Sequence, residues 1–291
     1  MTRTRATVIG FSAIAMWSLL ALFTVGSHEV PALQLNAICF AIGGAIGLAW
    51  GVSTGSLPQL RTVPWQIYAF GAAGLFGFHF LYFTALKLAP PAEAGLIAYL
   101  WPLLIVVFSG FLPGERLRRG HIFGAGIAFL GAALIVLRAG AGSTTGLGST
   151  AFLGYALAFL CALTWSGYSL MSRRFGAVPT IAVTSYSLAA GALSLVAHLM
   201  IEVTAWPSSA LGWGSVIALG AGPVGLAFFT WDVGVKRGDI QLLGTASYAA
   251  PLLSTLVLIL AGITAASPVI VLAAALIAAG ATFAARASQQ C

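Results

Sequence analysis

Charged side chains are scarce in this sequence of 291 residues. Only 7% of the residues are charged, with 13 Lys and Arg against 6 Asp and Glu, while 60% are hydrophobic and the mean hydropathy is +1.01. A soluble domain carries about 25% charged residues, so this composition indicates a chain that crosses a membrane several times. The net charge of +7 does not indicate nucleic acid binding, because the basic residues are scattered among loops and form no single face.

Cysteine is also rare, which limits the chemistry open to the chain. Cys39, Cys161 and Cys291 lie far apart, and two of them fall in apolar stretches, so we expect neither a disulfide framework nor a metal site, and no cofactor. An intramembrane protease would need paired aspartates, a Ser–His dyad or an HExxH motif. The sequence contains neither paired aspartates nor an HExxH motif, so an enzyme is the weaker hypothesis.

Long apolar stretches are abundant, and each is near the roughly 20 residues that a helix needs to cross a membrane. Pro- and Gly-containing breaks separate them. We expect ten spans, at residues 6–26, 32–51, 64–87, 91–112, 118–138, 151–172, 180–201, 211–235, 239–262 and 267–286. The predicted fold class is therefore an all-α polytopic membrane protein with ten transmembrane helices.

The second half of the chain repeats the first. The stretch Tyr99-Leu100-Trp101-Pro102-Leu103-Leu104 returns 149 residues later as Tyr248-Ala249-Ala250-Pro251-Leu252-Leu253. We expect a first repeat at 1–138, a linker at 139–150 and a second repeat at 151–291. Five spans in each repeat make the repeats inverted around a central cavity, a recurring design of transporters. A proline inside a span interrupts its helix, so we expect Pro102 and Pro251 to mark helix breaks that act in gating.

The basic residues predict the orientation in the membrane. With the N-terminus in the cytoplasm, every Lys and Arg except Lys87 and Arg138 falls on the cytoplasmic side of the ten spans. Cytoplasmic loops carry an excess of Lys and Arg. We therefore expect both termini to be cytoplasmic and the linker to be external.

Aromatic and small polar side chains recur along single faces of several spans. In lipid, such faces turn toward protein or toward a cavity. We expect the substrate cavity to be lined by Trp17, His79, Tyr82, Tyr99, Trp101, Trp165, Tyr168, Phe228, Ser247 and Tyr248. Four further tryptophans lie near span ends and fit anchors at the membrane surface instead: Trp50, Trp65, Trp206 and Trp213.

The acidic residues have structural interpretations. Glu93 lies in the first turn of the fourth span, where a carboxylate offsets the helix dipole. Asp239 fits an N-cap, and Asp232 stands four residues before Lys236, a spacing that suits an ion pair. His79 is then the titratable group placed at depth, and we expect it to form hydrogen bonds without relaying protons.

Glycines in the fifth and tenth spans predict close helix packing. Gly124, Gly126 and Gly131 lie in the former and Gly280 in the latter. Small residues at such positions let helix backbones approach in a membrane.

These features resemble those of the drug/metabolite transporter superfamily (EamA type). The plan of five plus five helices, Trp17-Ser18, Tyr99 to Pro102 and Tyr248 with Pro251 carry the resemblance, which covers almost the whole chain. Met1-Thr2-Arg3, with Ala6-Thr7 and Ile9-Gly10, makes the chain most similar to bacterial aromatic amino acid exporters. The resemblance implies a basket of helices with a central cavity formed by spans 1, 3, 4, 6, 8 and 9.

The function that we expect is export of aromatic, and possibly other apolar, amino acids or related metabolites by alternating access and facilitated efflux. An aromatic-rich cavity suits ring stacking. The alternative is a multidrug exporter of lipophilic cations, which bind ring faces; a deep carboxylate would favour it. The expected partners are the small-molecule substrate and the lipid bilayer of the bacterial cytoplasmic membrane. We expect no nucleic acid, and a monomer or weak oligomer.

Overall fold

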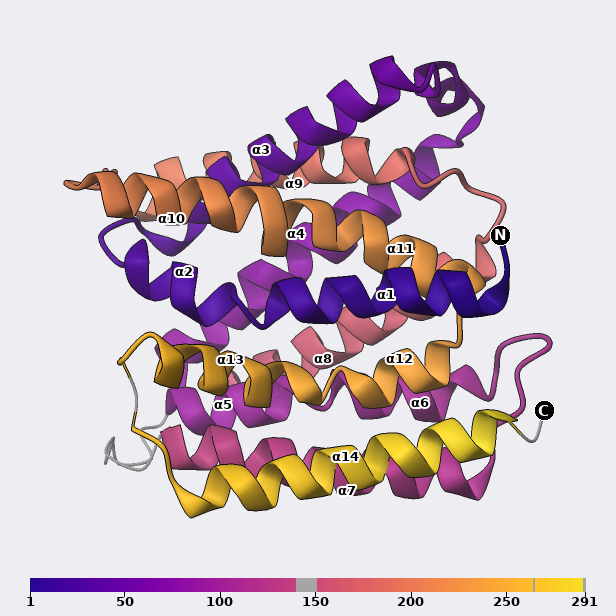
Figure 1. The fold of residues 1–291 in the computed structure, drawn as a ribbon. Coiled ribbons are helices and arrows are strands. Elements are labelled where there is room, and N and C mark those ends of the chain that lie inside the picture. Colours follow the sequence, from indigo (N-terminus) through magenta and orange to yellow (C-terminus); the bar gives the residue numbers. More distant parts are fainter. Residues whose placement is uncertain (140–150, 264, 290–291) are drawn as a thin grey trace.

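A computed structural model describes residues 1–139, 151–263 and 265–289, and every regular element in these ranges is helical. Long helices run between two ends of the molecule (Figure 1). Residues 140–150 of the expected linker and the side chain of Arg138 lie outside the described residues.

The helices follow the expected spans to within a few residues. In chain order they are α1 (Arg3–Trp17), α2 (Leu20–Gly26), α3 (Ala32–Ser53), α4 (Trp65–Leu88), α5 (Pro91–Ala98), α6 (Trp101–Ser109), α7 (Arg119–Ala139), α8 (Ala151–Arg174), α9 (Ala182–Ile201), α10 (Ala210–Ala221), α11 (Ala227–Arg237), α12 (Ile240–Ala246), α13 (Ala249–Leu260) and α14 (Pro268–Gln289). Among the described residues, eight helical units are long and apolar enough to cross a membrane, and Glu93–Ser109 and Arg119–Leu134 form shorter apolar helices.

Two spans are broken just before a proline. The chain leaves the helix between α5 and α6, and Pro102 is the second residue of α6; it leaves again between α12 and α13, and Pro251 is the third residue of α13. Proline is tolerated in a first helical turn because the N–H it lacks would have no partner there. The break frees the N–H of Leu103, which donates to the Tyr248 hydroxyl at 3.0 Å. One hydrogen bond therefore joins the break of the first half to that of the second.

Two further interruptions lie elsewhere. The first span bends at Ser18 and Leu19, between α1 and α2. A π-helical segment, Gly222–Leu226, separates α10 from α11 and contains Pro223. Such single-turn π segments often accompany functional sites.

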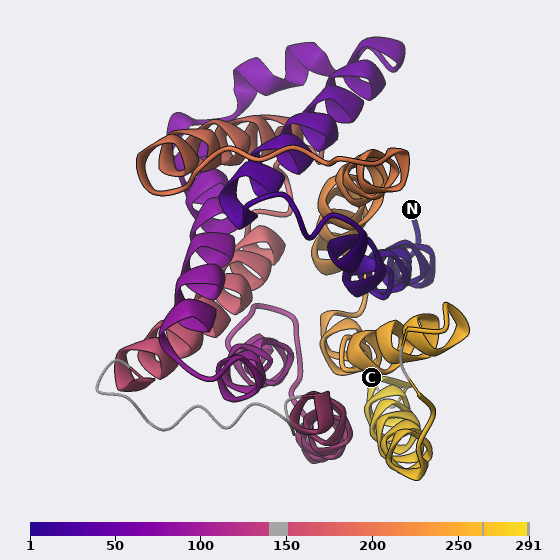
Figure 2. The same ribbon diagram turned by 90° about the vertical axis from the view of Figure 1, so that its left-hand side faces the viewer.

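The helices α7 and α14 form a close pair at one edge of the molecule (Figure 2). A Cβ atom added to Gly124 would lie 2.5 Å from the carbonyl oxygen of Gly280 and 2.9 Å from the amide nitrogen of Ala284. Only glycine fits at such an approach. A Cβ on Gly131 would likewise lie 2.8 Å from the carbonyl oxygen of Ala273 on α14, whereas Gly126 has open space where its Cβ would be. The expected close packing therefore holds for Gly124, Gly131 and Gly280 and is wrong for Gly126.

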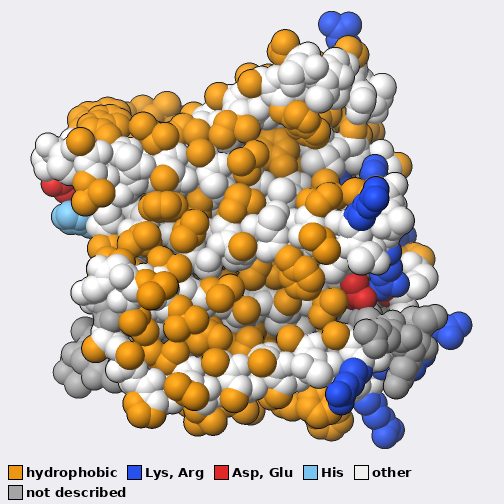
Figure 3. Space-filling view, in the orientation of Figure 1, with side chains coloured by type: hydrophobic (Ala, Val, Ile, Leu, Met, Phe, Trp, Pro, Cys, Tyr) orange, Lys and Arg blue, Asp and Glu red, His pale blue; other side chains and the backbone are white. Residues whose placement is uncertain are grey.

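The two ends of the molecule differ in charge. The helix α1 begins and α14 ends at the same end (Figure 1). Lys and Arg side chains gather there, while the broad middle of the visible face is apolar or uncharged (Figure 3). Apolar flanks between charged ends suit a protein surrounded by lipid.

Ion pairs close the basic end. Arg3 lies 3.5 Å from Glu115 and 3.3 Å from Asp239, and Glu115 also pairs with Arg173. The Arg173 guanidinium donates to the carbonyls of Val235 at 3.1 Å and Gly238 at 2.8 Å. The cluster thus ties α1, α8, the end of α11 and the start of α12 to the connection between α6 and α7.

The roles expected for two aspartates at this end are confirmed. The Asp239 carboxylate caps α12, since it accepts from the Leu242 N–H at 2.9 Å. Asp232 pairs with Lys236 at 2.9 Å, and both side chains are buried. Both carboxylates therefore have partners within the fold.

At the opposite end, carboxylates accept from backbone donors. Glu202 accepts from the N–H groups of Leu33 at 3.1 Å and Gln34 at 3.2 Å, and so caps α3. The Ser208 hydroxyl and N–H both donate to Glu29, and these bonds hold the pKa of its carboxyl below its usual value.

Candidate functional site

Aromatic side chains from four helices meet inside the molecule. The ring centroid of Trp17 (α1) lies 6.1 Å from that of Trp101 (α6) and 6.0 Å from that of Trp165 (α8). Phe228 (α11) lies 5.6 Å from Trp165. We call these four residues, with Trp231, the aromatic cluster; four of its five members were expected from the sequence to line the cavity.

Trp231 is the member that the sequence reasoning missed. Its centroid lies 5.1 Å from that of Trp17 and 5.8 Å from that of Trp101, and its side chain is fully buried. Its indole N–H donates to the Ser169 hydroxyl at 3.0 Å. The sequence feature that could have identified Trp231 is its position three residues after Phe228, on the same face of a helix.

His79 and Tyr168 border the aromatic cluster. The imidazole of His79 lies 6.1 Å from Phe228, and its Nδ1 bonds to the Leu75 carbonyl at 2.8 Å. Because a carbonyl only accepts, this nitrogen carries the proton. Tyr168 stacks on Trp165 at 5.2 Å.

Tyr82 reaches the cluster through one intermediate ring. It stacks on Phe78 at 6.1 Å, and Phe78 lies 5.3 Å from Trp165. Tyr82 therefore lies in a second layer of rings.

The remaining expected residues lie at the helix breaks instead of in the aromatic cluster. Tyr248 packs 5.8 Å from Phe129 of α7, and Tyr99 belongs to the same group of apolar contacts. The Ser247 hydroxyl donates to the Leu243 carbonyl at 2.8 Å. The ring contacts of the aromatic cluster thus come from α1, α4, α6, α8 and α11, while Tyr248, between α12 and α13, contacts Phe129 instead.

Trp17 has a partner that the other rings lack. Its indole N–H donates to the carbonyl of Pro223, in the π-helical segment, at 3.1 Å. Trp17 is only half-buried, whereas Trp101, Trp165 and Trp231 are 7%, 3% and 0% exposed. The aromatic cluster therefore has three enclosed indoles and one at its margin.

The four tryptophans assigned to the membrane surface lie on the outside of the molecule. Trp50, Trp65, Trp206 and Trp213 are 42%, 72%, 57% and 41% exposed. Their exposure separates them from the indoles of the aromatic cluster.

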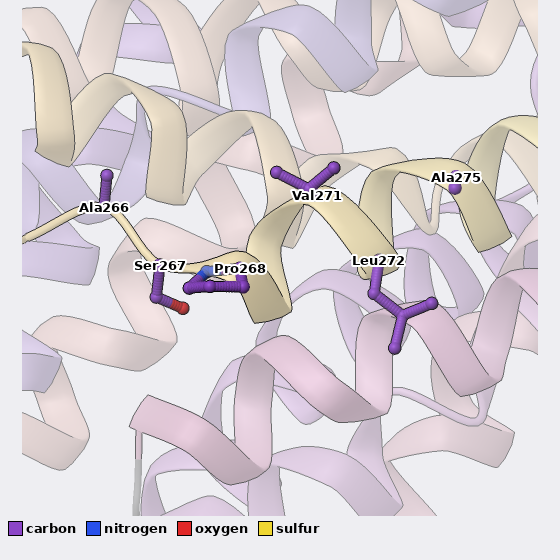
Figure 4. A pocket seen from close by; sticks show the side chains of 6 residues that line it. All are labelled: Ala266, Ser267, Pro268, Val271, Leu272 and Ala275. Atoms are coloured by element: carbon purple, nitrogen blue, oxygen red, sulfur yellow. The ribbon is translucent and has the colours of Figure 1, made fainter.

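An apolar pocket at the start of α14 shares no residue with the aromatic cluster. It is lined by Ala266, Ser267, Pro268, Val271, Leu272 and Ala275 (Figure 4). Its lining offers one hydroxyl and no charge, which gives little to recognise a polar solute. In the part of the chain that the structure describes, no group of three His, Cys, Asp or Glu side chains could hold a metal ion.

In the described part of the chain, the long helices with apolar flanks are those of a multi-pass membrane protein, and the aromatic rings gather between them. A model of the EamA-like transporter family matches residues 4–137 and again residues 152–286. The chain belongs to the EamA-like transporter family, and it is therefore a membrane transporter and not an enzyme.

Known relatives cover nearly the whole chain. It is 52% identical over 284 residues to a protein of Ancylobacter novellus named aromatic amino acid exporter YddG, across 98% of both chains. It is 25% identical to the Escherichia coli (strain K12) protein of the same name, across 88% of each. A crystal structure of a 51% identical protein superposes with a TM-score of 0.91 and covers 97% of this chain and 98% of that one.

Proposed function

We propose that this transporter exports aromatic amino acids, and other apolar amino acids or related metabolites less strongly, as a monomer or weak oligomer. The observation that carries the proposal is the convergence of Trp17, Trp101, Trp165, Phe228 and Trp231 from four helices. Aromatic rings arranged edge to face offer an aromatic solute the contacts that rings favour. The names of the relatives support the same substrate class.

We further propose ten spans in two inverted repeats, at 1–138 and 151–291, joined by the linker at 139–150. Two matches of one family model, each to about half of the chain, support the duplication. The breaks before Pro102 and Pro251 fall at equivalent places, as internal repeats require. In this arrangement one part rocks against the other, and the half-helices act in gating and bring Tyr99, Ser247 and Tyr248 toward the substrate.

The proposed location is the bacterial cytoplasmic membrane, with both termini in the cytoplasm. The end that gathers the Lys and Arg side chains (Figure 3) supports this orientation, because basic residues are enriched on the cytoplasmic side.

We propose that efflux follows the concentration gradient of the solute. Asp232 is occupied by Lys236, and His79 donates within its own helix. A zwitterionic amino acid carries no net charge, so its movement does not require an accompanying proton. In the proposed site His79 acts as a hydrogen-bonding group beside Phe228.

The alternative, an exporter of lipophilic cations, has less support. Such a site favours a free carboxylate beside aromatic faces. The buried carboxylate nearest in sequence to Phe228 and Trp231 is that of Asp232, which already has its counter-ion at 2.9 Å.

A flux assay tests both the substrate and the coupling. Liposomes containing the purified protein are loaded with labelled phenylalanine, leucine or tetraphenylphosphonium, and release is followed with ionophores that collapse the proton gradient and membrane potential. We expect phenylalanine release to persist and to exceed that of the other two, and His79→Gln to retain most of it. Release of the cation alone would refute the proposed substrate, while release that stops with the ionophores would refute uncoupled efflux.

A further inference from the structure

The π-helical segment beside the aromatic cluster presents a backbone acceptor to the site. Pro223 has no N–H of its own, and its carbonyl oxygen lies 3.1 Å from the indole nitrogen of Trp17. The Trp17 ring also contacts Trp231 at 5.1 Å and Phe228 at 6.5 Å. The Pro223 carbonyl is therefore at the margin of the aromatic cluster, within hydrogen-bonding reach of a group placed among its rings.

Trp17 is the ring that is best placed to move. It is the last residue of α1, directly before the bend at Ser18 and Leu19. It is half-buried, and its donor is held only by the Pro223 carbonyl. Trp231, by comparison, is fully buried within α11 and bonded to Ser169. A solute that enters the aromatic cluster can thus displace Trp17 with less disruption than Trp231.

An aromatic amino acid carries a cationic donor three bonds from its ring. We propose that the α-ammonium group of the substrate takes the place of the Trp17 indole N–H at the Pro223 carbonyl, while the substrate ring packs within the aromatic cluster. An ammonium group has three donors and no acceptor, and hydrogen bonds from charged donors are stronger than those from neutral ones. Backbone carbonyls at helix interruptions bind cations in other transporters by the same physics.

This inference rests on the proposed function and adds a basis for specificity. The carbonyl recognises the amine end of the solute, so amines and amino acids compete for it and the corresponding carboxylic acids do not. In the empty site the Trp17 N–H keeps the carbonyl satisfied, because a buried carbonyl without a donor is costly.

The test compares three ligands that share a benzyl group: phenylalanine, phenethylamine, which lacks the carboxylate, and 3-phenylpropionate, which lacks the amine. Their affinities are measured on purified full-length protein in nanodiscs, with labelled phenylalanine displaced by the other two and 3-phenylpropionate also labelled directly. Trp17→Phe keeps a ring but removes the competing N–H. Trp231→Phe is the matched control. It removes an indole N–H that donates to the Ser169 hydroxyl, and this hydroxyl can rotate toward another partner.

We expect Trp17→Phe to raise the affinities of phenylalanine and phenethylamine relative to 3-phenylpropionate by roughly two- to tenfold, the factor that one net hydrogen bond provides. Trp231→Phe should change all three affinities by one common factor. If Trp17→Phe also changed all three affinities by one common factor, the proposed ammonium site would be wrong, while the proposed aromatic site would still stand. Wild-type protein that binds none of the three ligands would instead refute the proposed function.

Discussion

At the scale of single residues, Trp101 makes the most nearly perpendicular ring contacts of the aromatic cluster. Its ring plane stands at 83° to that of Trp17, 86° to that of Trp165 and 89° to that of Trp231. Edge-to-face pairs of this kind are favoured because the positive edge of one ring meets the negative face of the next. Trp101 therefore holds rings from three other helices in one arrangement.

Replacing Trp101 by alanine should reduce phenylalanine flux several-fold for each inserted molecule. Each aromatic pair contributes about 0.5–1.5 kcal/mol beyond burial, and the side chain participates in three such pairs within the aromatic cluster. Trp65→Ala is the control, because Trp65 is 72% exposed and should change flux by less than about twofold, as surface substitutions usually do. Liposome flux normalised to inserted protein measures both, and equal losses would argue against a substrate site at Trp101.

The difference between predicted and observed site residues has a physical origin. Trp17, Trp165 and Phe228 were predictable because they share helix faces with small or polar residues, which turn toward protein in lipid, and Trp101 because it lies deep in its expected span. Trp231 lies near the end of its span in the sequence, where tryptophan also serves as a surface anchor; its burial depends on the α1 and α8 residues that cover it. The partner of the Tyr248 hydroxyl was not predictable either, since Leu103 lies 145 residues away.

At the scale of helices, the backbones of α7 and α14 approach each other closely at Gly124 and Gly280. Gly124→Ile should destabilise the protein by about 1–3 kcal/mol, because overpacking at a close backbone approach forces the helices apart. Gly126→Ile, two residues away on α7, meets open space and should have little effect. Thermal unfolding in detergent measures the two variants, and an equal fall in Tm would show that packing at Gly124 is not the cause.

The helix ends were largely predictable, whereas the interruptions were only partly so. Proline chemistry predicted the start of α4 and the breaks before Pro102 and Pro251. The bend at Ser18 and Leu19 contains neither proline nor glycine; the Ser18 hydroxyl donates to the Ala15 carbonyl at 2.5 Å, a local bond that competes with the helix. Whether such a residue bends a helix is decided by the surrounding packing, which a sequence pattern does not contain.

At the scale of the whole molecule, ion pairs at the basic end hold together elements from both halves of the chain. In the proposed cycle the basic end must open, and opening separates the partners Arg3, Glu115, Arg173 and Asp239. The opposite end relies more on carboxylates that cap helices, such as Glu202 on α3. The two ends therefore close by different contacts.

Single cysteines should reveal the proposed orientation. Thr54 follows α3 at the basic end and Ser208 precedes α10 at the other, and both are exposed. In a background with Cys291→Ser, since Cys39 and Cys161 are buried, an impermeant thiol reagent added to intact cells should label Ser208→Cys and not Thr54→Cys. Labelling of Thr54→Cys alone would mean that the protein sits the other way round.

The bond between Leu103 and Tyr248 also has a consequence for synthesis. Ribosomes add about 5–20 residues per second, so the 145 residues that separate the two partners take roughly 7–30 s to make. During that time α5 and α6 are already made, while the Tyr248 hydroxyl that accepts from the Leu103 N–H does not yet exist. An unpaired N–H in lipid costs several kcal/mol, so we expect the break between α5 and α6 to reach its final arrangement only after Tyr248, between α12 and α13, has been made.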